Sequence, residues 1–325
     1  MNLIIIISLS IVSLLISIIF GNKSIANKKL TAKNELLSRQ KSEIESQRDE
    51  IETQKNIITE QWREVEDVNQ KLFSSLNYAE RIQRAAVSSI EDVKVLFSES
   101  FVYYKPRDIV SGDYYRCVKC GRFSVMITAD CTGHGIPGAF LSMLGLSGLK
   151  EFLATENDAE NPGSILDRMR GFIKTTLAGK NGKETISDGM DMTICCFDFD
   201  NMELRYAIAN QKIILIRRGE LQRIKGDNMP VGRYVREKEH FESFTMKIEK
   251  GDIFYMFSDG IEDQLGGNTS DGYGRKFLLR NLQNFLLEIS LEPMEKQREL
   301  LDEKVLAWRG NMPQVDDMTL VGIRV

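Results

Sequence analysis

The sequence predicts an α+β protein in which antiparallel sheets covered by helices follow a membrane-spanning helix and a coiled-coil helix. Three observations predict it: an uncharged apolar run at 3–20, the absence of glycine and proline between Gly21 and Pro106, and short β-rich runs from Glu99 onward. Hairpin-connected strands, with helices grouped apart, are typical of antiparallel sheets covered by helices. We therefore divide the 325 residues into an anchor (1–21), a helical linker (22–98) and a folded domain (99–325).

Composition and charge exclude several classes of protein. With 42% hydrophobic and 28% charged residues, the chain is neither intrinsically disordered nor collagen-like. Five cysteines in 325 residues do not make a small disulfide-rich scaffold. The formal net charge of −4 argues against non-specific binding to nucleic acid, so we expect no nucleic-acid partner.

The apolar run at residues 3–20 predicts a single membrane-spanning helix. As a helix it extends roughly 27 Å, just enough for the hydrocarbon core of a bilayer. Basic residues follow the run at once and none precedes it: Lys23, Lys28 and Lys29. Such flanks stay on the cytoplasmic side. We therefore expect a single-pass protein of the inner (cytoplasmic) membrane with its folded domain (99–325) in the cytoplasm.

A cleaved signal peptide is the alternative, because Ser24-Ile25-Ala26 is a small-x-small triplet. Against it, no Lys or Arg precedes the apolar run, and the run is longer than the about 7–15 residues of a usual signal-peptide core. An odd number of cysteines, two of them the neighbours Cys195 and Cys196, is also a poor arrangement for an oxidising compartment. We expect an uncleaved anchor.

Residues 22–98 predict a coiled-coil linker. Aliphatic residues recur every seven positions: Leu30, Leu37, Ile44, Ile51, Ile58, Val65 and Leu72. Three positions later the chain has mostly glutamine: Gln40, Gln47, Gln54 and Gln61, then Val68. A stable coiled coil has apolar residues at both positions, so this pattern indicates a weak parallel homodimer. A solvated spacer helix is the alternative, because thirteen basic and thirteen acidic residues balance between Asn22 and Ser98.

The end of the linker is expected to pack on the folded domain. In the segment 78–86, three small or apolar residues follow helical spacing: Ala79, Ile82 and Ala86. They predict the face of the helix that docks on the domain.

Short β-rich runs and turns predict the elements of the folded domain. Gly121 lies between two such runs and predicts a hairpin, and Pro137 predicts the first turn of a helix. The expected strands are 114–118, 123–128, 190–197, 203–209, 212–217, 241–248, 252–257 and 318–325. The further expected helices are 162–177, 275–288 and 293–308.

Aspartates stand at the ends of strongly apolar strands in this domain. They are Asp113, Asp130, Asp259, and Asp316 with its neighbour Asp317. Aspartate is common in turns, so each one alone is a turn residue. Neighbouring strands would bring their ends together, and clustered carboxylates need a cation to offset their repulsion. Oxygen ligands suit hard ions, so the pattern predicts two Mn²⁺ or Mg²⁺ ions that activate a water molecule and neutralise a phosphate.

Five motifs of the domain occur in a characteristic order: Lys105-Pro106-Arg107-Asp108-Ile109-Val110-Ser111-Gly112-Asp113-Tyr114-Tyr115, Asp130-Cys131-Thr132-Gly133-His134-Gly135-Ile136-Pro137-Gly138-Ala139-Phe140, Asp188-Gly189-Met190-Asp191, Phe257-Ser258-Asp259-Gly260-Ile261-Glu262 and Asp316-Asp317-Met318-Thr319-Leu320. In these motifs the chain resembles the SpoIIE/RsbU-type phosphatases, the bacterial branch of the PP2C-like, metal-dependent serine/threonine phosphatases (PPM). The resemblance covers residues 99–325. It implies a PPM-type αββα sandwich of two antiparallel sheets flanked by helices, with a two-metal site between the sheets.

The resemblance implies a role for each matching residue. Asp130 corresponds to the carboxylate that bridges both metal ions, and the backbone carbonyl of Cys131 completes the coordination of one of them. Asp113 corresponds to a ligand of that same ion. Asp259 and Asp316 correspond to ligands of the other ion.

Neighbouring residues have more than one interpretation. Asp317 is the alternative to Asp316, although the spacing to Thr319 favours Asp316. Asp191 is expected to orient the ligands rather than to bind an ion. Relatives often carry an acidic residue where this chain has Arg116.

Two basic residues complete the expected catalytic set with Asp130. His134 either donates a proton to the leaving oxygen or serves only the turn 133–135. Arg107, together with Lys105, either steers the phosphate or is an exposed charge on the approach to the sheet.

Two further features are expected to be structural, and a third has two interpretations. Cys117 and Cys120 have the spacing of half a zinc knuckle, but no second pair follows, so we expect two hairpin cysteines. His240 stands among charged residues and is expected at the surface. The glycine-rich segment 265–274 is either a lid that contacts substrate or a plain surface loop.

These observations predict a membrane-anchored, metal-dependent protein serine/threonine phosphatase. It would hydrolyse phosphoserine or phosphothreonine on a signalling protein, and the resemblance suggests an anti-sigma-factor antagonist. The linker is expected to dimerise the enzyme and to couple a membrane or partner signal to the metal site. The alternative is a catalytically inert, phosphatase-like scaffold that binds partners through the coiled coil and the domain surface, but the presence of all four acidic positions argues against it.

Overall fold

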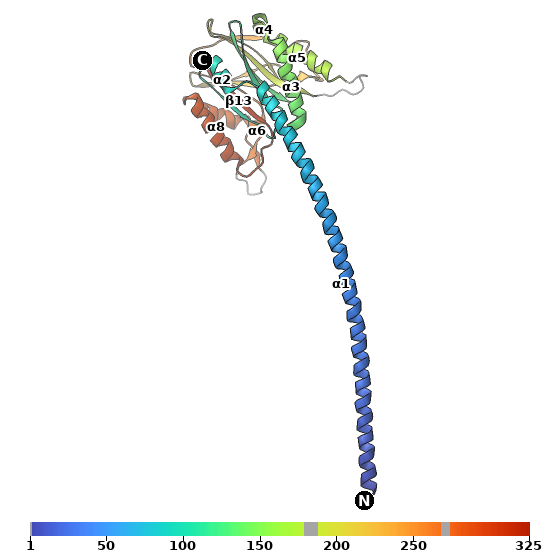
Figure 1. The fold of residues 1–325 in the computed structure, drawn as a ribbon. Helices are drawn as coiled ribbons and strands as arrows, with labels where there is room; N and C mark the ends of the chain where they lie inside the picture. The colour runs from blue at the N-terminus through green and yellow to red at the C-terminus, as the bar shows by residue number, and fades with distance from the viewer. Residues whose placement is uncertain (1, 179–187, 268–273) are drawn as a thin grey trace. The chain divides into compact units, whose positions relative to one another are not determined.

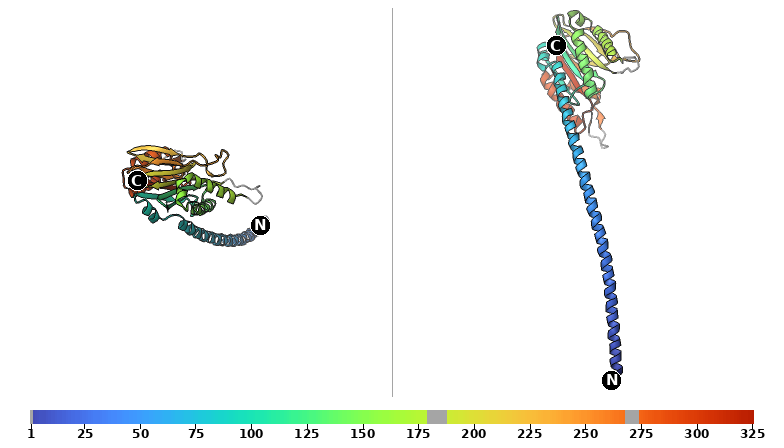
Figure 2. Two further views of the ribbon diagram at one scale, coloured as in Figure 1. Left: turned by 90° about the horizontal axis from the view of Figure 1, so that it is seen from above. Right: turned by 45° about the vertical axis from the view of Figure 1, so that its right-hand side comes forward.

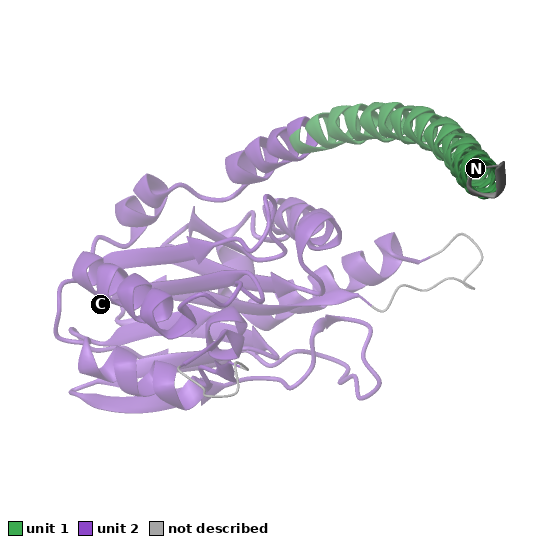
Figure 3. Ribbon diagram, turned by 90° about the horizontal axis from the view of Figure 1, so that it is seen from below, with its two compact units in different colours: residues 1–73 green, residues 74–325 purple. Residues whose placement is uncertain are grey.

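The chain forms two compact units, which a computed structural model describes over residues 2–178, 188–267 and 274–325 (Figure 1). One unit ends at Phe73 and the other begins at Ser74 (Figure 3). Helix α1 (Asn2–Ala86) contributes to both, and its last turns belong to the second unit. The second unit therefore begins 25 residues before Glu99, the predicted start of the folded domain, and includes residues 74–98 of the predicted linker.

Helix α1 continues for 85 residues because nothing in its sequence ends it. It contains no proline, which would remove a backbone donor, and its one glycine is Gly21. The large apolar side chains from Ile5 to Phe20 are each at least 50% exposed. This end of the helix is long and apolar enough to cross a membrane, a property that signal sequences share.

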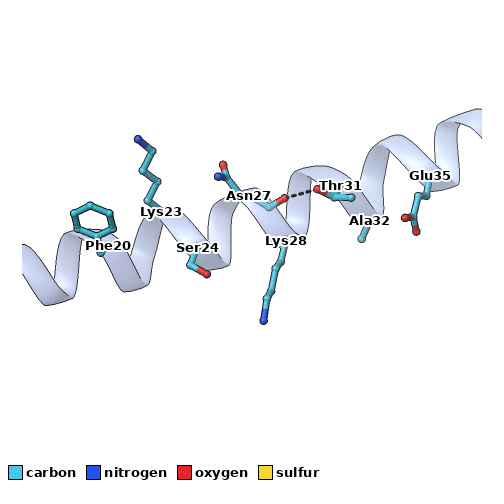
Figure 4. A pocket seen from close by; sticks show the side chains of 8 residues that line it. All are labelled: Phe20, Lys23, Ser24, Asn27, Lys28, Thr31, Ala32 and Glu35. Carbon is cyan, nitrogen blue, oxygen red and sulfur yellow. Dashed lines mark hydrogen bonds between the residues drawn. The ribbon is translucent and has the colours of Figure 1, made fainter.

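The apolar run ends in the segment that Figure 4 shows. Beyond Phe20, Lys23 and Lys28 project to opposite sides of the helix. One turn later the hydroxyl of Thr31 donates a hydrogen bond to the backbone carbonyl of Asn27 at 3.0 Å. The polar side of the boundary is thus regular helix.

The second unit contains two large antiparallel sheets. In order across the first sheet, the strands are β1 (Ser100–Lys105), β13 (Met318–Arg324), β10 (Ile253–Phe257), β6 (Lys212–Arg217) and β7 (Glu220–Lys225). In order across the second, they are β2 (Tyr114–Cys120), β3 (Phe123–Cys131), β4 (Gly189–Asp198), β5 (Glu203–Ala209) and β9 (Phe244–Lys247), with β8 (Val231–Gly232) beside β4. A short pair is formed by β11 (Leu265–Gly266) and β12 (Arg275–Lys276).

Helices cover the outer faces of both sheets, and a core fills the space between them. The described helices of this unit are α2 (Ile90–Leu96), α3 (Gly135–Phe152), α4 (Glu156–Glu160), α5 (Pro162–Thr176), α6 (Gly260–Asp263), α7 (Leu279–Glu288) and α8 (Met294–Arg309), besides the end of α1. Alternate residues of a strand face opposite sides. Thus Met126 of β3 packs in the core between the sheets, whereas Ile127 packs with α3 and α5.

The first sheet follows the same rule. Phe254 of β10 lies in the core between the sheets, and Tyr255 packs under α7 and α8. In Figures 1 and 2, α3 and α5 (green) lie on one side of the strands and α8 (red) on the other. The predicted αββα arrangement of two antiparallel sheets flanked by helices is therefore confirmed.

Two predicted elements differ in extent, and two edge strands were not predicted. The helix expected at 275–288 begins only at Leu279, because Arg275 and Lys276 pair with β11 as a short strand. The strand expected at 241–248 is limited to β9. Strands β1 and β7, which were not among the predicted strands, lie at the two edges of the first sheet, where a strand has only one neighbour.

The end of α1 docks on its unit only partly through the predicted face. Ala79 and Ile82 are exposed, with Ile82 47% exposed, whereas Ala86 is partly buried and packs on the core beneath α3 and α5. Gln83 is buried: its Nε2 group donates to the Ser111 carbonyl oxygen at 2.6 Å and to the Ser142 hydroxyl at 2.7 Å, and its Oε1 accepts from the Ser111 N–H at 3.0 Å. The helix end is thus held by hydrogen bonds as well as by an apolar contact.

A second contact holds the C-terminus of this helix. The guanidinium of Arg116 donates to the backbone carbonyl of Ala86 at 3.0 Å. The last carbonyls of a helix lack partners within the helix, so a basic side chain there is stabilising. Arg116 therefore has a structural role at the position where relatives often carry an acidic residue.

Replacing Gln83 with leucine is expected to destabilise the second unit. The change leaves the buried N–H and carbonyl of Ser111 without these partners, which costs about 1–3 kcal/mol. Urea denaturation of a fragment containing residues 74–325 measures the loss. The exposed neighbour Ile82 provides the control, since Ile82→Ala should shift the free energy of unfolding by less than about 0.5 kcal/mol. Equal stability of the two variants would contradict the role of Gln83.

Candidate active site

Carboxylates from both sheets meet at one end of the sandwich. Asp130 is near the end of β3 and pairs across the ladder with Asp191 of β4. Asp259 follows β10, Asp316 lies just before β13, and Asp113 lies just before β2. Strand topology therefore gathers the residues that the sequence spreads over about two hundred positions.

Asp113 is the most buried of these carboxylates, with 2% of its surface exposed. Burial raises the pKa of Asp113 to about 7. A hydrogen bond from Ser258 favours the ionised form and lowers this pKa, but its effect is smaller than that of burial. The Ser258 hydroxyl donates to Asp113 Oδ2 at 2.6 Å and accepts from the Thr319 N–H at 3.0 Å. Ser258 therefore fixes the orientation of Asp113, a role that the sequence interpretation did not assign.

Asp130 lies at the electrostatic centre of the group. Burial raises its pKa well above the ordinary range, and the charges of four other carboxylates add to the effect: Asp113, Asp259, Asp191 and Asp316. Carboxylates influence one another in this way only when they are close. All four predicted aspartate ligands are therefore brought together with Asp191.

Asp191 accepts a hydrogen bond from the side-chain amide of Asn210, which directly follows β5. Asn210, whose φ is +58°, donates from Nδ2 to Asp191 Oδ2 at 2.7 Å. Burial raises the pKa of Asp191 to about 6, in spite of that hydrogen bond. One of its oxygens is thus engaged, which supports the expected orienting role.

Asp259 and Asp316 form the outer part of the cluster. Partial burial raises the pKa of Asp259 to about 6, and the charges of Asp263 and Asp316 act in the same direction. Burial likewise raises the pKa of Asp316, while the hydrogen bond from the Asp317 N–H and the neighbouring side chains of His134 and Arg107 act in the opposite direction. His134 and Arg107 are therefore electrostatic neighbours of the cluster.

Asp317 has a different use from Asp316. It is buried, and its Oδ1 and Oδ2 accept hydrogen bonds from the backbone N–H groups of Arg107 and Gly112, each at 2.7 Å. The Asp317 N–H in turn donates to Asp316 Oδ1 at 2.8 Å. With both oxygens of Asp317 committed to the backbone, the arrangement favours Asp316 as the proposed ligand.

Close backbone packing positions Cys131. A Cβ placed on Gly112 would lie 2.6 Å from the Gly133 carbonyl oxygen and 3.3 Å from the Cys131 carbonyl oxygen. The segment before Asp113 therefore packs directly against the segment after Asp130. The Cys131 thiol lies in the core beneath α3 and α5, and burial raises its pKa well above the ordinary range, so the proposed ligand of this residue is its backbone carbonyl.

The turn that starts α3 depends on its glycines. Gly133 and Gly135 have φ values of +82° and +65°, a region that side chains rarely adopt. His134 lies between them, and its Nδ1 is 3.0 Å from Asp108 Oδ2. Asp108 therefore fixes the orientation of the imidazole, which is about half exposed at the rim of the cluster.

The two basic residues of the first motif have different surroundings. The guanidinium of Arg107 is exposed and donates to the Val315 carbonyl oxygen at 2.8 Å, next to Asp316. Lys105 instead forms an ion pair with Asp302 of α8 at 2.5 Å. Lys105 is thus engaged by a helix of the outer layer.

The remaining candidates lie apart from the cluster. Cys117 faces the core between the sheets and Cys120 faces the α3–α5 layer, so their thiols are on opposite faces of β2 and cannot bind one ion. His240 is 73% exposed and lies 3.0 Å from Asp167. Of the expected loop 265–274, residues 268–273 lie outside the described part of the chain.

The chemistry of these residues fits divalent cations. In the described residues no three His, Cys, Asp and Glu side chains are already arranged around one point as the ligands of a single ion. Five carboxylates nevertheless lie at neighbouring strand ends, with Asp130 opposite Asp191 in the ladder, and the charges of the other four add to the burial that raises the pKa of Asp130. All the donor atoms are oxygens, which suit Mg²⁺ or Mn²⁺. A cation bound among them would offset the repulsion.

The raised pKa values predict how metal-free stability depends on pH. A carboxyl with a raised folded-state pKa stabilises the fold below its unfolded pKa of about 3.9, and that contribution is lost as the pH rises through the folded value. For Asp191, Asp259 and Asp113 the folded values are about 6, 6 and 7. In EDTA, the melting temperature of residues 74–325 should therefore fall between about pH 5 and pH 7.5.

Added Mn²⁺ should reverse this loss. At a hundred times its Kd a ligand contributes about 2.7 kcal/mol, or roughly 5–10 °C for a unit of this size. The increase should be larger at pH 7.5 than at pH 5.5, because protons compete for the same oxygens. In the control variant Asp259→Asn, the fall in melting temperature with rising pH and the increase in melting temperature on adding Mn²⁺ should both be smaller. An increase independent of pH would contradict the assignment of these carboxylates.

Comparison with known proteins agrees with this geometry. Residues 121–325 match the family described as stage II sporulation protein E (SpoIIE). The SiaA-PP2C domain of Pseudomonas aeruginosa is similar with a TM-score of 0.70 and 27% identity, over 79% of this chain and 98% of that one. Among curated proteins no significant match was found.

Two more distant structures share the fold. The PP2C phosphatase domain, with a fragment of the regulatory domain, of SpoIIE from Bacillus subtilis has a TM-score of 0.53 and 19% identity, over 70% of this chain and 62% of that one. The serine/threonine phosphatase of S. agalactiae has a TM-score of 0.52 and 14% identity, over 70% of this chain and 99% of that one. The resemblance found in the five motifs is confirmed.

Proposed function

Because this chain belongs to the SpoIIE family, whose solved relatives are PP2C-type phosphatases, we propose that it is a membrane-anchored, metal-dependent protein serine/threonine phosphatase. The observation that carries the proposal is the gathering of carboxylates around Asp130 at the ends of both sheets. A signalling protein phosphorylated on serine or threonine is the proposed substrate, with an anti-sigma-factor antagonist as the specific candidate from the family resemblance.

The proposed ligands are those that the motifs suggest: Asp113, Asp130, the Cys131 carbonyl, Asp259 and Asp316. When bound, two Mn²⁺ or Mg²⁺ ions lower the pKa of a water molecule and neutralise negative charge on the phosphate. Ser258 holds Asp113, and Asn210 holds Asp191, so part of the ligand geometry is set by the chain itself.

His134 and Arg107 complete the proposed machinery. When the imidazole is protonated on both nitrogens, Nδ1 donates to Asp108 and Nε2 carries the proton that would pass to the leaving serine oxygen, which leaves a neutral imidazole. The Arg107 guanidinium keeps donors beyond the one used on Val315, and these suit a phosphate oxygen. Both residues already act on Asp316 electrostatically, so they lie near the place where the phosphate would bind.

A hydrolysis assay tests the proposal. The full chain in detergent should release phosphate from a phosphoserine peptide when Mn²⁺ is present and stop when EDTA is added. Activity that persists in EDTA would overturn the metal-dependent mechanism. No activity with several phosphoproteins, despite measurable Mn²⁺ binding, would favour the inert scaffold.

Membrane anchoring and dimerisation are part of the same proposal. The heptad residues of α1 from Leu30 to Leu72 are 48–64% exposed in the single chain, so a second helix would find an uncovered apolar stripe. Ala79 and Ile82 continue the same heptad positions and are exposed, whereas Gln83 faces the folded unit. We therefore extend the proposed seam of a parallel homodimer to Ile82.

The dimer proposal predicts the effect of charge within the seam. Residues 22–325 should sediment as a dimer at micromolar concentration, and the double variant Ile51→Lys and Ile58→Lys should sediment as a monomer. Asn56→Lys and Gln70→Lys add the same charge outside the seam and should leave the dimer intact. A monomer of the unmodified protein would remove the proposal.

A further inference from the structure

A cleft of about 350 Å³ opens beside the carboxylate cluster. Its acidic lining comes from β3, β4, the end of β10 and α6: Asp130, Asp191, Asp259 and Glu262. Its basic lining comes from the hairpin of β6 and β7: Lys212, Arg223 and Lys225. The volume falls in the range of about 300–1,000 Å³ typical of ligand sites. The cleft therefore joins the candidate active site to a group of positive charges.

The hairpin register places these charges on one face. Lys212 pairs directly with Lys225, and Arg223 precedes Lys225 by two residues, so all three side chains project from the same side. Like charges directly opposite one another destabilise a sheet. Lys212 is offset by Glu262, at 3.2 Å, whereas Arg223 and Lys225 are exposed and form no ion pair or side-chain hydrogen bond within the described residues.

Two other basic side chains close to the second sheet and the hairpin are paired with acids. Arg217 is bound by Asp252, and Lys238 is bound by Asp227, with the Lys238 ion pair at 2.6 Å. Within the cleft, by contrast, the charges of Arg223 and Lys225 have no acidic partner among the described residues. The cleft also contains an amide with an unused donor: Gln211 accepts from Thr128 through Oε1 at 3.3 Å, and its buried Nε2 has no partner among the described residues.

We propose that Arg223 and Lys225 determine specificity by binding acidic side chains next to the phosphorylated residue of the substrate. The inference rests on the proposed phosphatase function and names the class of segment that the site accepts. A phosphoserine directed at the carboxylate cluster would place its flanking residues along the cleft. Aspartates or glutamates there would supply the anions that these two basic residues lack, and the concave shape favours a peptide segment over a planar lipid surface.

Binding measurements test this inference separately from hydrolysis. The full chain carrying Asp130→Asn, in detergent with Mn²⁺, is titrated into two fluorescent phosphoserine peptides, one with acidic and one with neutral flanking residues. The added double variant Arg223→Ala and Lys225→Ala should weaken binding of the acidic peptide by about tenfold, as about 1.4 kcal/mol predicts. The neutral peptide should change by less than about twofold.

Charge reversal provides the matched test of folding. Arg223→Glu with Lys225→Glu should make the protein prefer a phosphopeptide with basic flanking residues, which an unfolded variant would not do. The control carries the same change at exposed cations outside the cleft, Lys150→Glu with Arg236→Glu, and should keep the original preference.

The outcomes separate the inference from the proposed function. Equal weakening of both peptides, or no weakening, would overturn the role of Arg223 and Lys225. Loss of binding to vesicles of anionic lipid, with peptide binding unchanged, would also overturn it, in favour of a membrane contact. Selective peptide binding by a protein that hydrolyses no phosphopeptide would support the recognition role and contradict the phosphatase function instead.

Discussion

Replacing Asp130 with asparagine is expected to lower Mn²⁺-dependent hydrolysis of phosphoserine at least about a hundredfold. Changing a residue that only orients a metal ligand typically lowers activity or metal affinity about 10–100-fold. Asp130 is the proposed ligand of both ions, so its replacement should lower activity by more than that. Its pKa also shows that its charge is opposed by four other carboxylates. The variant should therefore be at least as stable as the unmodified protein in EDTA at pH 7.5.

Two measurements on the Asp130→Asn variant distinguish chemistry from folding. Phosphate release measures the activity, and thermal unfolding in EDTA measures the stability. Asp200→Asn is the matched control, because Asp200 is exposed in a turn away from the cluster and should change neither quantity. If Asp130→Asn kept more than about a tenth of the activity, the central role of this carboxylate would be wrong.

Replacing Gly138 with alanine is expected to displace the backbone segments that carry the proposed metal ligands Asp113 and Cys131. A Cβ there would overlap the Gly133 carbonyl oxygen and lie 2.8 Å from Gly112 Cα, both backbone atoms that cannot move aside as a side chain can. Inserting a methyl into such packing costs about 1–3 kcal/mol. Because Gly112 precedes Asp113, Gly138→Ala should also lower the affinity for Mn²⁺.

Gly171→Ala is the control for this prediction. Gly171 lies within α5, and a methyl group added there would have no neighbouring atom within 4 Å. Alanine at this position should therefore stabilise the protein by about 0.5–1 kcal/mol through helix propensity. Urea denaturation and Mn²⁺ titration of both variants provide the comparison. A Gly138→Ala protein as stable as Gly171→Ala, with unchanged Mn²⁺ affinity, would contradict the packing argument.

The sequence predicted the fold and the location of the cluster because both depend on local patterns. Apolar strands such as 253–257 and 318–324 are continuous, and each is flanked by an aspartate in a turn. The rule that strand ends of one core meet was then enough to bring Asp259 and Asp316 together. No knowledge of strand order was required for that step.

The contacts that depend on strand order were not predictable in this way. Ser258 and Asp317 were visible beside predicted ligands, but only the tertiary structure shows that Ser258 binds Asp113 and Asp317 binds two backbone amides. The docking face of α1 was predicted correctly only at Ala86, and wrongly at Ala79 and Ile82, because the prediction relied on apolar spacing alone. Gln83 docks instead, since hydrogen bonds to Ser111 satisfy its polar atoms in a buried position.

Gln83 and Ile82 are adjacent in helix α1, and this limits which insertions into the helix would leave the proposed dimer intact. Adjacent residues of an α-helix point about 100° apart, so the proposed seam and the face that binds the folded unit keep a fixed angular offset. Inserting seven residues between Leu30 and Leu72 would keep the upstream heptad positions nearly in phase with Ile82, whereas inserting one residue would move them by about 100° around the helix axis. The proposed dimer therefore depends on the phase of the heptad repeat rather than on the length of the helix.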